Sequence, residues 1–293
     1  MQKIILLGGP TASGKSSLAL KWADEHDGEI VNGDSMQIYR ELDIITACPT
    51  AQEMENTPHH LYRHLKGDDP CSAESWRDMA RVVIDDVWSR GKTPIIVGGT
   101  GLYFKALVYG LSKIPEIDET IRSDVRKDVK ENGPEQAHDK LAALDPEIAG
   151  RIAPGDSQRI SRALEVVKST GKTLSYWQSQ PLSGGLIDED VDVSKHILLR
   201  ERAELYQRCN DRFEKMIHNE GAIAEAQDLM ALNYPASLPV MKSLGVPQII
   251  EYLEGNLSLE EAITLSQTAT RQFAKRQMTW FRNQFSDWKI EEL

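Results

Sequence analysis

The feature that most constrains the fold is the segment Gly9–Ser16, which reads G-x-x-x-x-G-K-S. It follows Lys3–Leu7, a short apolar run typical of a buried parallel strand, and it opens a helical stretch, Ser16–Trp22. A glycine-rich loop between a strand and a helix points backbone N–H groups and the helix N-terminus at a phosphate. The segment therefore predicts a P-loop for a diphosphate or triphosphate, with Lys15 as a point charge and the Ser16 hydroxyl directed to Mg²⁺.

Strands and helices alternate around this motif. Further strands are expected at Glu29–Val31, Pro94–Val97 and Lys195–Leu199. Helical apolar spacing covers Ser75–Ser89 and Leu102–Tyr109. Strands that end in glycine-rich or polar turns and alternate with helices predict an α/β fold with a P-loop NTPase-like parallel sheet as its core.

The pattern changes after Gly110, where only helices are expected before the last strand. They are Glu119–Lys130, Glu135–Leu144, Glu147–Ile152 and Ser157–Lys168, followed by an expected loop at Ser179–Asp192. Residues 112–195 are therefore predicted to form a helical insertion domain, and 1–111 with 196–293 the catalytic core. The C-terminal part of that core is predicted to be helical at Glu204–Asn219, Ala222–Leu232, Val246–Leu253, Leu259–Ser266 and Gln267–Trp280.

Charge is distributed unevenly along the chain. The formal net charge of −11 argues mildly against a nucleic-acid partner. Two windows nevertheless concentrate basic residues, Arg151–Lys172 and Ala269–Asn283. Basic stripes on an acidic body suit a polyanion bound at one face, although solvated helix faces would produce the same pattern.

Cysteine usage and hydropathy set the expected compartment. The three cysteines form no CxxC pair, which excludes a disulfide framework and a cysteine zinc site. The longest apolar run near the start, Ile4–Leu7, is far shorter than the ~20 residues of a membrane span. We therefore expect a cytoplasmic protein with no membrane partner. A monomer is expected as well, although neither cysteine usage nor hydropathy bears on it.

Three further features have open interpretations. Asp34 follows the second predicted strand, at the sheet edge that carries the P-loop, and could be a base, a metal ligand or a helix cap. The turn Gly98–Tyr103 at the same edge could serve function or only close helix–strand packing. Arg159 and Arg162 share one helix face, where they could clamp phosphates or simply decorate the surface.

The segment Arg271–Arg282 interleaves basic residues with aromatic ones. Lys and Arg contact backbone phosphates while aromatic rings stack or buttress, so the pattern is typical of a nucleic-acid platform. We expect the aromatic rings to face mostly inward and the charges to face a partner. There is no HExxH or GxSxG motif and no Ser-His-Asp spacing, and the adjacent His59 and His60 are interpreted as loop residues after Pro58.

Five segments in one order resemble the tRNA dimethylallyltransferase (tRNA isopentenyltransferase) family, nearly end to end. They are Gly8–Ser16, Val31–Tyr39, Val97–Tyr103, Gln158–Glu165 and Lys275–Trp280. The resemblance implies a prenyltransferase that moves a dimethylallyl group from dimethylallyl diphosphate to N6 of adenosine 37 in tRNA and releases diphosphate. It also implies Mg²⁺ as cofactor, no nucleotide hydrolysis, and an insertion domain that grips the anticodon stem-loop.

The resemblance also assigns roles to individual residues. Asp34 matches the general base, Thr11 lies near the bridging oxygen, and Lys15 and Arg212 lie near the diphosphate. The prenyl diphosphate would be held by Gly9, Pro10, Thr11, Ala12, Ser13, Gly14, Lys15 and Ser16, with Ser16 toward the metal. The tRNA would be contacted by Asp34, Ser35, Met36, Gln37, Thr100, Arg122, Gln158, Arg159, Ile160, Ser161, Arg162, Lys275, Arg276 and Arg282.

One loop departs from the family pattern. Many relatives carry an arginine and a Gly-Tyr-Arg-Gln run where this chain has Lys242–Gln248. Lysine cannot make a bidentate contact, and Pro247 supplies neither a cation nor an N–H, so the tRNA contact expected at Lys242 is left open.

Three rival functions share part of this pattern. A small-molecule P-loop kinase would need neither the Arg159 and Arg162 helix nor the basic tail. An isopentenyltransferase acting on free AMP would not need a tRNA-gripping insertion. A purely structural RNA-binding protein would not need the P-loop.

Overall fold

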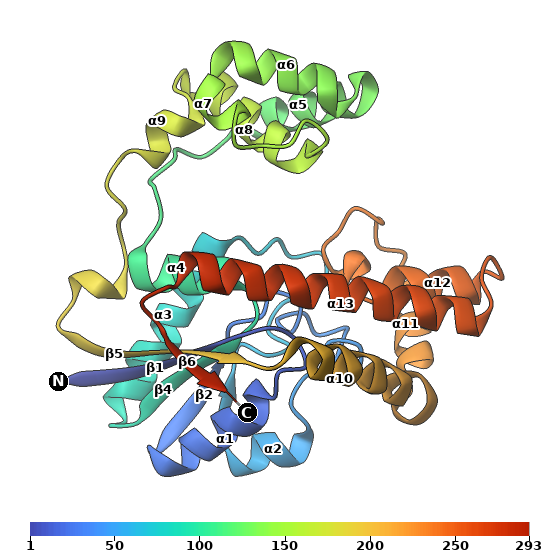
Figure 1. Ribbon diagram of the computed structural model, residues 1–293. Coiled ribbons are helices and arrows are strands. Elements are labelled where there is room, and N and C mark those ends of the chain that lie inside the picture. The colour runs from blue at the N-terminus through green and yellow to red at the C-terminus, as the bar shows by residue number, and fades with distance from the viewer. Residues whose placement is uncertain (293) are drawn as a thin grey trace. The chain divides into compact units, whose positions relative to one another are not determined.

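The computed structural model describes residues 1–292, and these form two compact units (Figure 1). One unit comprises Met1–Val108 and the chain from Leu186 onward, and the other is Tyr109–Gly185. The boundary expected at residue 195 is therefore too late. Val191–Leu199 is a strand whose first residue already pairs with Gln2. Its polar residues, such as Asp192 and Ser194, hide the strand from an apolar pattern.

A six-stranded parallel sheet forms the centre of the first unit, in the order β3-β2-β4-β1-β5-β6. Its strands are β1 (Gln2–Gly8), β2 (Gly28–Asn32), β3 (His59–His60), β4 (Thr93–Gly98), β5 (Val191–Leu199) and β6 (Lys289–Glu292). The central strand β1 is buried from Ile4 to Gly8, as its apolar composition predicts. The expected α/β class and parallel core are confirmed. Loops at the carboxyl ends of such strands diverge and leave room for a ligand.

Helices cover both faces of this sheet and also lie beyond the carboxyl ends of its strands (Figure 1). They are α1 (Lys15–Glu25), α2 (Ala51–Asn56), α3 (Ala73–Ser89), α4 (Gly101–Tyr109), α10 (Arg202–Lys215), α11 (Ala222–Ala231), α12 (Val246–Leu253) and α13 (Leu259–Gln284). In Figure 1, α1 lies below the sheet, whereas α4 and α13 lie above it. Ala19 and Ala23 of α1 pack on the lower face. On the upper face, the rings of Phe104 and Phe281 meet edge to face at 6.1 Å.

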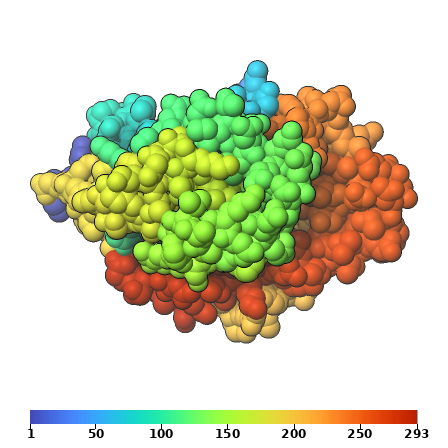
Figure 2. Space-filling view, turned by 90° about the horizontal axis from the view of Figure 1, so that it is seen from above, coloured from blue at the N-terminus to red at the C-terminus, as the bar shows by residue number. Residues whose placement is uncertain are grey.

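The C-terminal helices behave as one packed layer. In Figure 2 the C-terminal part of the chain, coloured orange to red, forms a continuous surface. The two separate helices expected at Leu259–Ser266 and Gln267–Trp280 are one helix, because no Gly or Pro interrupts α13. A capping box at Ser258 and Glu261 fixes its start.

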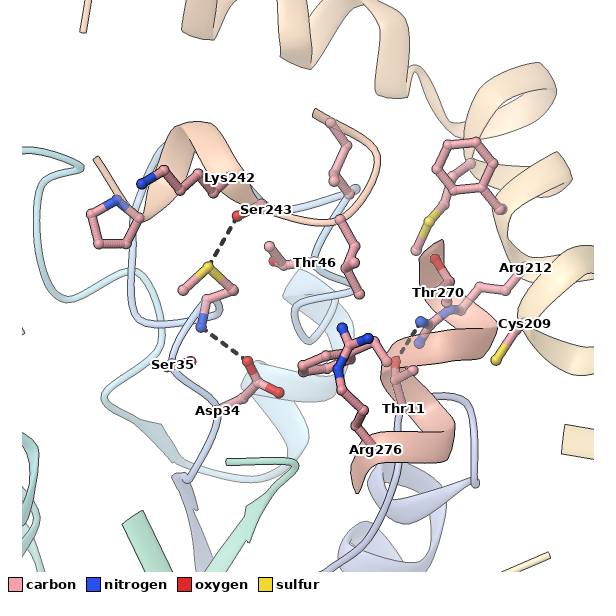
Figure 3. Close-up of a pocket in the computed structure, with 17 residues that line it drawn as sticks. Thr11, Asp34, Ser35, Thr46, Cys209, Arg212, Lys242, Ser243, Thr270 and Arg276 are labelled. Carbon is pink, nitrogen blue, oxygen red and sulfur yellow. Dashed lines mark hydrogen bonds between the residues drawn. The ribbon is translucent and has the colours of Figure 1, made fainter. Parts of the chain in front are cut away.

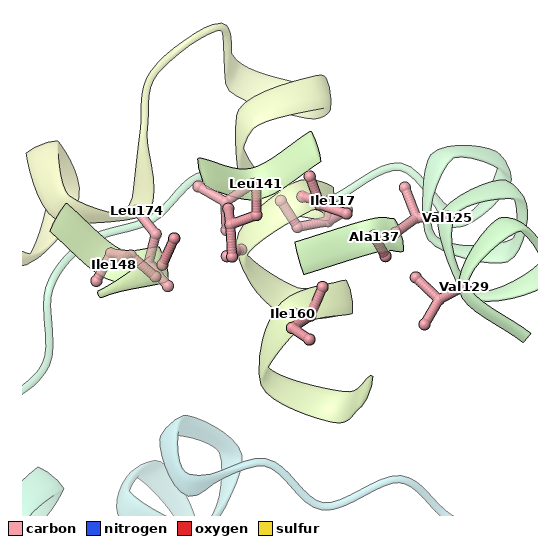
Figure 4. Close-up of a cluster of buried hydrophobic side chains, with 12 residues drawn as sticks. Ile117, Val125, Val129, Ala137, Leu141, Ile148, Ile160 and Leu174 are labelled. Carbon is pink, nitrogen blue, oxygen red and sulfur yellow. The ribbon is translucent and has the colours of Figure 1, made fainter. Parts of the chain in front are cut away.

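The second unit is helical, as expected, and has its own core. Its helices are α5 (Glu119–Asn132), α6 (Pro134–Leu144), α7 (Pro146–Ala149), α8 (Ser157–Thr170) and α9 (Leu174–Gln178). Their apolar faces bury a cluster that includes Val125, Leu141 and Ile160 (Figure 4). Asp145, itself buried, caps α7 and accepts the Ser175 N–H at 2.9 Å. This unit therefore has the packing of an independent domain.

Two strands at the sheet edges differ from the expectations. His59 and His60, interpreted as loop residues, form β3 and pair with Ile30 and Val31. Lys289–Glu292 forms β6 beside β5, although nothing in its charged sequence predicts a strand. Edge strands are short and polar because burial on one side suffices, so they lack the apolar signal. No helix in the described part of the chain is long and apolar enough to cross a bilayer.

Candidate functional site

The P-loop connects β1 to α1, as predicted, and its shape depends on glycine at two positions. Gly9 has φ of 153°, and a Cβ there would lie 2.5 Å from the Leu198 carbonyl oxygen. Gly14 caps α1 in the left-handed conformation, with φ of 99°. Arginines from the chain after β5 hold the loop backbone from outside. Arg200 donates to the Ser13 carbonyl at 2.7 Å, and Arg208 donates to the Ala12 carbonyl at 2.9 Å.

Thr11 is held at both of its polar groups. Its N–H donates to Oε1 of Gln277 at 2.9 Å. Its hydroxyl accepts a hydrogen bond from the Arg212 guanidinium at 2.6 Å. Desolvation lowers the pKa of Arg212, which still has an acidic neighbour in Asp34. The structure therefore brings together Thr11 and Arg212, a pair that the sequence places 201 residues apart.

Lys15 is the second cation at the loop. Its Nζ donates to the Pro10 carbonyl at 2.6 Å, so the ammonium lies against the loop. Desolvation lowers the pKa of Lys15 to about 8, while the Asp34 carboxylate raises it and Arg212 lowers it further. An anionic ligand beside Lys15 would oppose the desolvation and favour the charged ammonium.

Asp34 lies in the turn that follows β2. Asn32, which is fully buried, accepts the Asp34 N–H at 2.8 Å and donates to the Asp34 carbonyl at 3.0 Å. One carboxylate oxygen of Asp34, Oδ1, accepts the Met36 N–H at 2.9 Å. Of the three roles left open, helix capping is excluded, because no helix begins at Asp34.

The turn after β4 supports the Asp34 loop and also needs glycine for packing. The Thr100 hydroxyl accepts the Ser35 N–H at 2.9 Å, and the Thr100 N–H donates to the Gly33 carbonyl at 3.2 Å. A Cβ at Gly98 would lie 2.0 Å from the backbone of Gly33, and one at Gly101 would lie 2.0 Å from the Trp280 ring. The glycines of this turn therefore allow close packing, and Thr100 holds the Asp34 loop.

Two cavities meet at these side chains. The P-loop cavity, of about 260 Å³, is lined by residues 11–17 together with Gln37 and Arg208. The larger cavity, of about 380 Å³, is lined by apolar residues such as Phe213 and Phe273 and by Lys242 and Arg276 (Figure 3). The residues common to both cavities are Thr11, Asp34, Thr46 and Arg212. A substrate in one cavity would meet a substrate in the other at these four side chains.

The residues of the Asp34–Gln37 segment do not all line the same cavity. Ser35 and Met36 line the larger cavity, and the Met36 sulfur accepts a hydrogen bond from the Ser243 hydroxyl. The Nε2 group of Gln37 donates hydrogen bonds to the carbonyls of Thr46 and Ala47, both at 2.9 Å. Its amide group therefore holds the neighbouring loop as well as lining the P-loop cavity.

On α13 the aromatic rings face inward and the cations face outward, as the sequence predicts. Phe281 of α13 and Phe285, just after its end, are buried, whereas Lys275, Arg276 and Arg282 are exposed. The Arg276 guanidinium also lies 5.8 Å from the centre of the Phe273 ring, at the wall of the larger cavity.

In the second unit, the expected tRNA contacts divide into exposed and buried positions. Gln158, Arg159 and Arg162 are exposed on α8. Ile160 and Ser161 are buried at 0 % and 7 % exposure, so their side chains face the interior of this unit. The apolar face of an amphipathic helix must turn inward, and positions 160 and 161 lie on it.

Arginines of this unit gather around one buried carboxylate. Glu165, 1 % exposed, accepts a hydrogen bond from Arg126 at 3.0 Å. Glu165 also raises the pKa of Arg162, which desolvation, Arg122 and Arg126 lower. Arg122 pairs with Glu119 at 2.7 Å. One carboxylate thus faces several guanidiniums, which leaves local positive charge.

The described residues contain no group of three or more His, Cys, Asp or Glu side chains that could hold a metal ion. Ser16, at the N-terminus of α1, is exposed and lines the P-loop cavity with Asp34. Mg²⁺ typically keeps several waters and binds phosphate oxygens with one or two protein groups, so this donor set fits it.

Sequence reasoning assigned no role to Asn32, Gln277 or Arg208, which shape the site. Each lies inside or beside a segment that the sequence singles out. Gln277 and Arg208 depend on partners from distant segments, whereas Asn32 bonds Asp34, two residues away. Gln277 and Thr11, for example, are 266 residues apart.

Comparisons with known proteins agree with the family resemblance of the sequence. A family model described as IPP transferase matches residues 37–284, and one described as isopentenyl transferase matches residues 2–68. The chain is 47% identical to a tRNA dimethylallyltransferase of Rhizobium johnstonii, over 97% of this chain and 94% of that protein. It is 46% identical to a protein of the same name from Agrobacterium fabrum, with the same coverage.

Two solved structures are also similar. A tRNA isopentenylpyrophosphate transferase from Bacillus halodurans has 34% identity and a TM-score of 0.71, covering 100% of this chain and 90% of that one. A eukaryotic dimethylallyltransferase, described in crystallographic snapshots as acting on tRNA, has 28% identity and a TM-score of 0.81. The match covers 100% of this chain and 74% of the eukaryotic one.

Proposed function

The chain belongs to the IPP transferase family, and on this premise we propose that it transfers a dimethylallyl group from dimethylallyl diphosphate to N6 of adenosine 37 in tRNA. The observation that carries the proposal is the junction of two cavities at Thr11, Asp34, Thr46 and Arg212. A phosphate-binding loop opens on one side of this junction, and a wider, partly apolar cavity opens on the other. A diphosphate ester and a flat base can therefore meet end to end.

Asp34 is the proposed general base. One of its carboxylate oxygens is engaged by the Met36 N–H, which leaves Oδ2 for the substrate. Oδ2 orients the N6 amino group and accepts its proton as the N6–carbon bond forms and the carbon–oxygen bond to diphosphate breaks. The ionised carboxylate is the competent form for this step.

The departing diphosphate carries the developing negative charge. Lys15 and Arg212 place two cations at the P-loop, and the N-terminus of α1 adds its dipole. Thr11, held by Arg212, lies where the two cavities meet and would contact the bridging oxygen. These donors are already positioned, so they require little reorganisation in the transition state.

Mg²⁺ is the proposed cofactor. Ser16 would hold it together with diphosphate oxygens and water, as the donor chemistry of the loop allows. When bound, the ion neutralises charge on the diphosphate.

The acceptor is proposed to bind through exposed cations in both units. On α13 these are Lys275, Arg276 and Arg282, and in the second unit they are Arg159 and Arg162, together with the half-buried Arg122. The adenine must leave its stack to reach Asp34, and unstacking a loop nucleotide costs only a few kcal/mol. A tRNA acceptor implies a cytoplasmic reaction, and we propose a monomer as the acting form.

Labelled dimethylallyl diphosphate tests the proposal directly. The protein is incubated with the label and Mg²⁺, and with unmodified tRNA, AMP or ATP as acceptor. We expect label in tRNA alone, at an adenosine beside the anticodon, with one diphosphate released per transfer. Label in AMP would instead indicate a free-nucleotide enzyme, and phosphate release from ATP without tRNA would indicate a kinase or ATPase.

A further inference from the structure

Gln277 lies in the middle of α13 and is 6 % exposed. Its Oε1 accepts the Thr11 N–H at 2.9 Å, and its Nε2 donates to the Gly99 carbonyl at 2.9 Å. One partner is a donor and the other an acceptor, so a single orientation of the carboxamide satisfies both. The side chain thus joins the P-loop to the turn after β4.

The turn after β4 in turn holds the Asp34 loop. Thr100, which follows Gly99, accepts the Ser35 N–H through its hydroxyl and donates its own N–H to Gly33. A continuous set of hydrogen bonds therefore runs from Thr11 through Gln277 to the loop of Asp34.

The space between these groups is small. A Cβ at Gly99 would lie 2.2 Å from Gln277 Nε2 and 3.3 Å from Asp34 Oδ2. The carboxamide and the carboxylate therefore flank the same glycine.

We propose that Gln277 is a positioning residue, which sets the separation between Thr11 at the leaving group and Asp34 at the nucleophile. This rests on the proposed function, in which those two residues contact the two reacting groups. Packing alone would be served by any side chain of similar volume. A side chain that bonds two loops at once holds them in the geometry of attack, where a displacement of about 1 Å can cost on the order of 10²-fold in rate.

Two substitutions separate positioning from packing. Gln277→Met keeps the volume and loses both hydrogen bonds. Gln277→Glu keeps the acceptor for Thr11 but loses the donor for Gly99, and it buries a carboxylate, which destabilises the fold. Gln267→Met is the matched control, because Gln267 also lies on α13 and bonds Glu214 of α10 at 3.0 Å, away from the P-loop.

The measurements are single-turnover transfer to tRNA at saturating substrates, melting temperature, and calorimetric affinity for dimethylallyl diphosphate. A second carboxylate beside Asp34 moves the acid limb of the rate profile to higher pH, so rates are compared on the alkaline plateau. We expect Gln277→Met to lose about 10²-fold in rate. Gln277→Glu should keep more of the rate than Gln277→Met while melting at a lower temperature, and the control should match the parent.

Rates that follow the order of melting temperatures, or that stay near the parent value in both variants, would overturn the positioning role. Calorimetry provides an independent readout, because misplacing Thr11 should weaken diphosphate binding several-fold in Gln277→Met. If the parent protein transferred nothing to tRNA, the proposed function would fail, and unchanged calorimetric affinity in Gln277→Met would still reject the positioning role.

Discussion

The candidate residues at the sheet edge and those of the helical unit differ in how the fold holds them. Thr11 and Gln277 are bonded to backbone or side chains from distant segments, and Asp34 is held within its own turn by Asn32 and Met36. Arg122 and Arg159 pair instead with acids three residues earlier on the same helix, Glu119 and Asp156. Preorganised groups suit the chemical step, because they need little rearrangement in the transition state. Exposed cations suit the binding of a polyanion, because each phosphate contact adds a small part of the affinity. The comparison predicts losses in rate at the sheet edge and losses in tRNA binding in the helical unit.

Asp34→Asn should produce the largest effect. The amide keeps the size of the side chain but cannot accept the N6 proton, so we expect kcat and kcat/KM to fall by roughly 10²–10⁴. Affinity for tRNA should change by less than about tenfold. Single-turnover transfer at saturating tRNA, measured across a Mg²⁺ series, provides the test. Near-normal chemistry would remove Asp34 from catalysis, and rescue by added Mg²⁺ would assign it to the metal.

Lys15→Met should weaken binding of dimethylallyl diphosphate by about 10–100-fold, the usual range for a hydrogen bond to a charged group. The pKa of Lys15 near 8 gives a pH signature. The binding cation is present below pH 8 and is lost as the pH rises, so the parent's affinity should fall above that value while the variant's stays flat. Calorimetry from pH 7 to 10 measures both. Lys21→Met, an exposed change on the same helix, should retain the parent's pH dependence.

Arg276→Ala and Lys275→Ala on α13 should act on tRNA binding rather than on chemistry. Removing one cation that contacts a phosphate should flatten the dependence of log affinity on log salt by roughly one unit. Dimethylallyl diphosphate affinity should stay at the parent value. Binding titrations between low and moderate salt provide the measurement, with Lys21→Ala as a control on the opposite face of the sheet. An unchanged salt slope in both α13 variants would show that these cations are solvated surface residues that do not contact tRNA.

Arg159→Ala and Arg162→Ala on α8 should have the smallest effect on rate. At saturating tRNA we expect kcat within about twofold of the parent, with a salt slope reduced by at most about one unit per variant. Arg162 lies beside Glu165 and the other arginines of its cluster, whereas Arg159 pairs only with Asp156 among the ion pairs described. A large fall in kcat in either variant would break the division between the two regions, because it would give the helical unit a part in the chemistry.

Local patterns made the sheet edge predictable from the sequence. The P-loop, the strand before it and the helix after it are adjacent in the chain, and Asp34 directly follows a buried strand. The same reasoning failed where a pattern is polar: β3, β6 and the first residues of β5 carry no apolar alternation. On α8 it identified the segment but not its inward face, on which Ile160 belongs to the core.

The sequence by itself determined the fold class, the phosphate loop, the carboxylate at its edge and the family. These features depend on the spacing of residues that are close together in the chain, and this spacing can be read from the sequence. Only the tertiary structure decided that Gln277 and Arg212 hold Thr11, and that two cavities meet at four side chains. The physical reason is that such contacts join segments up to 266 residues apart, and a hydrogen bond between them forms only after helices and strands pack.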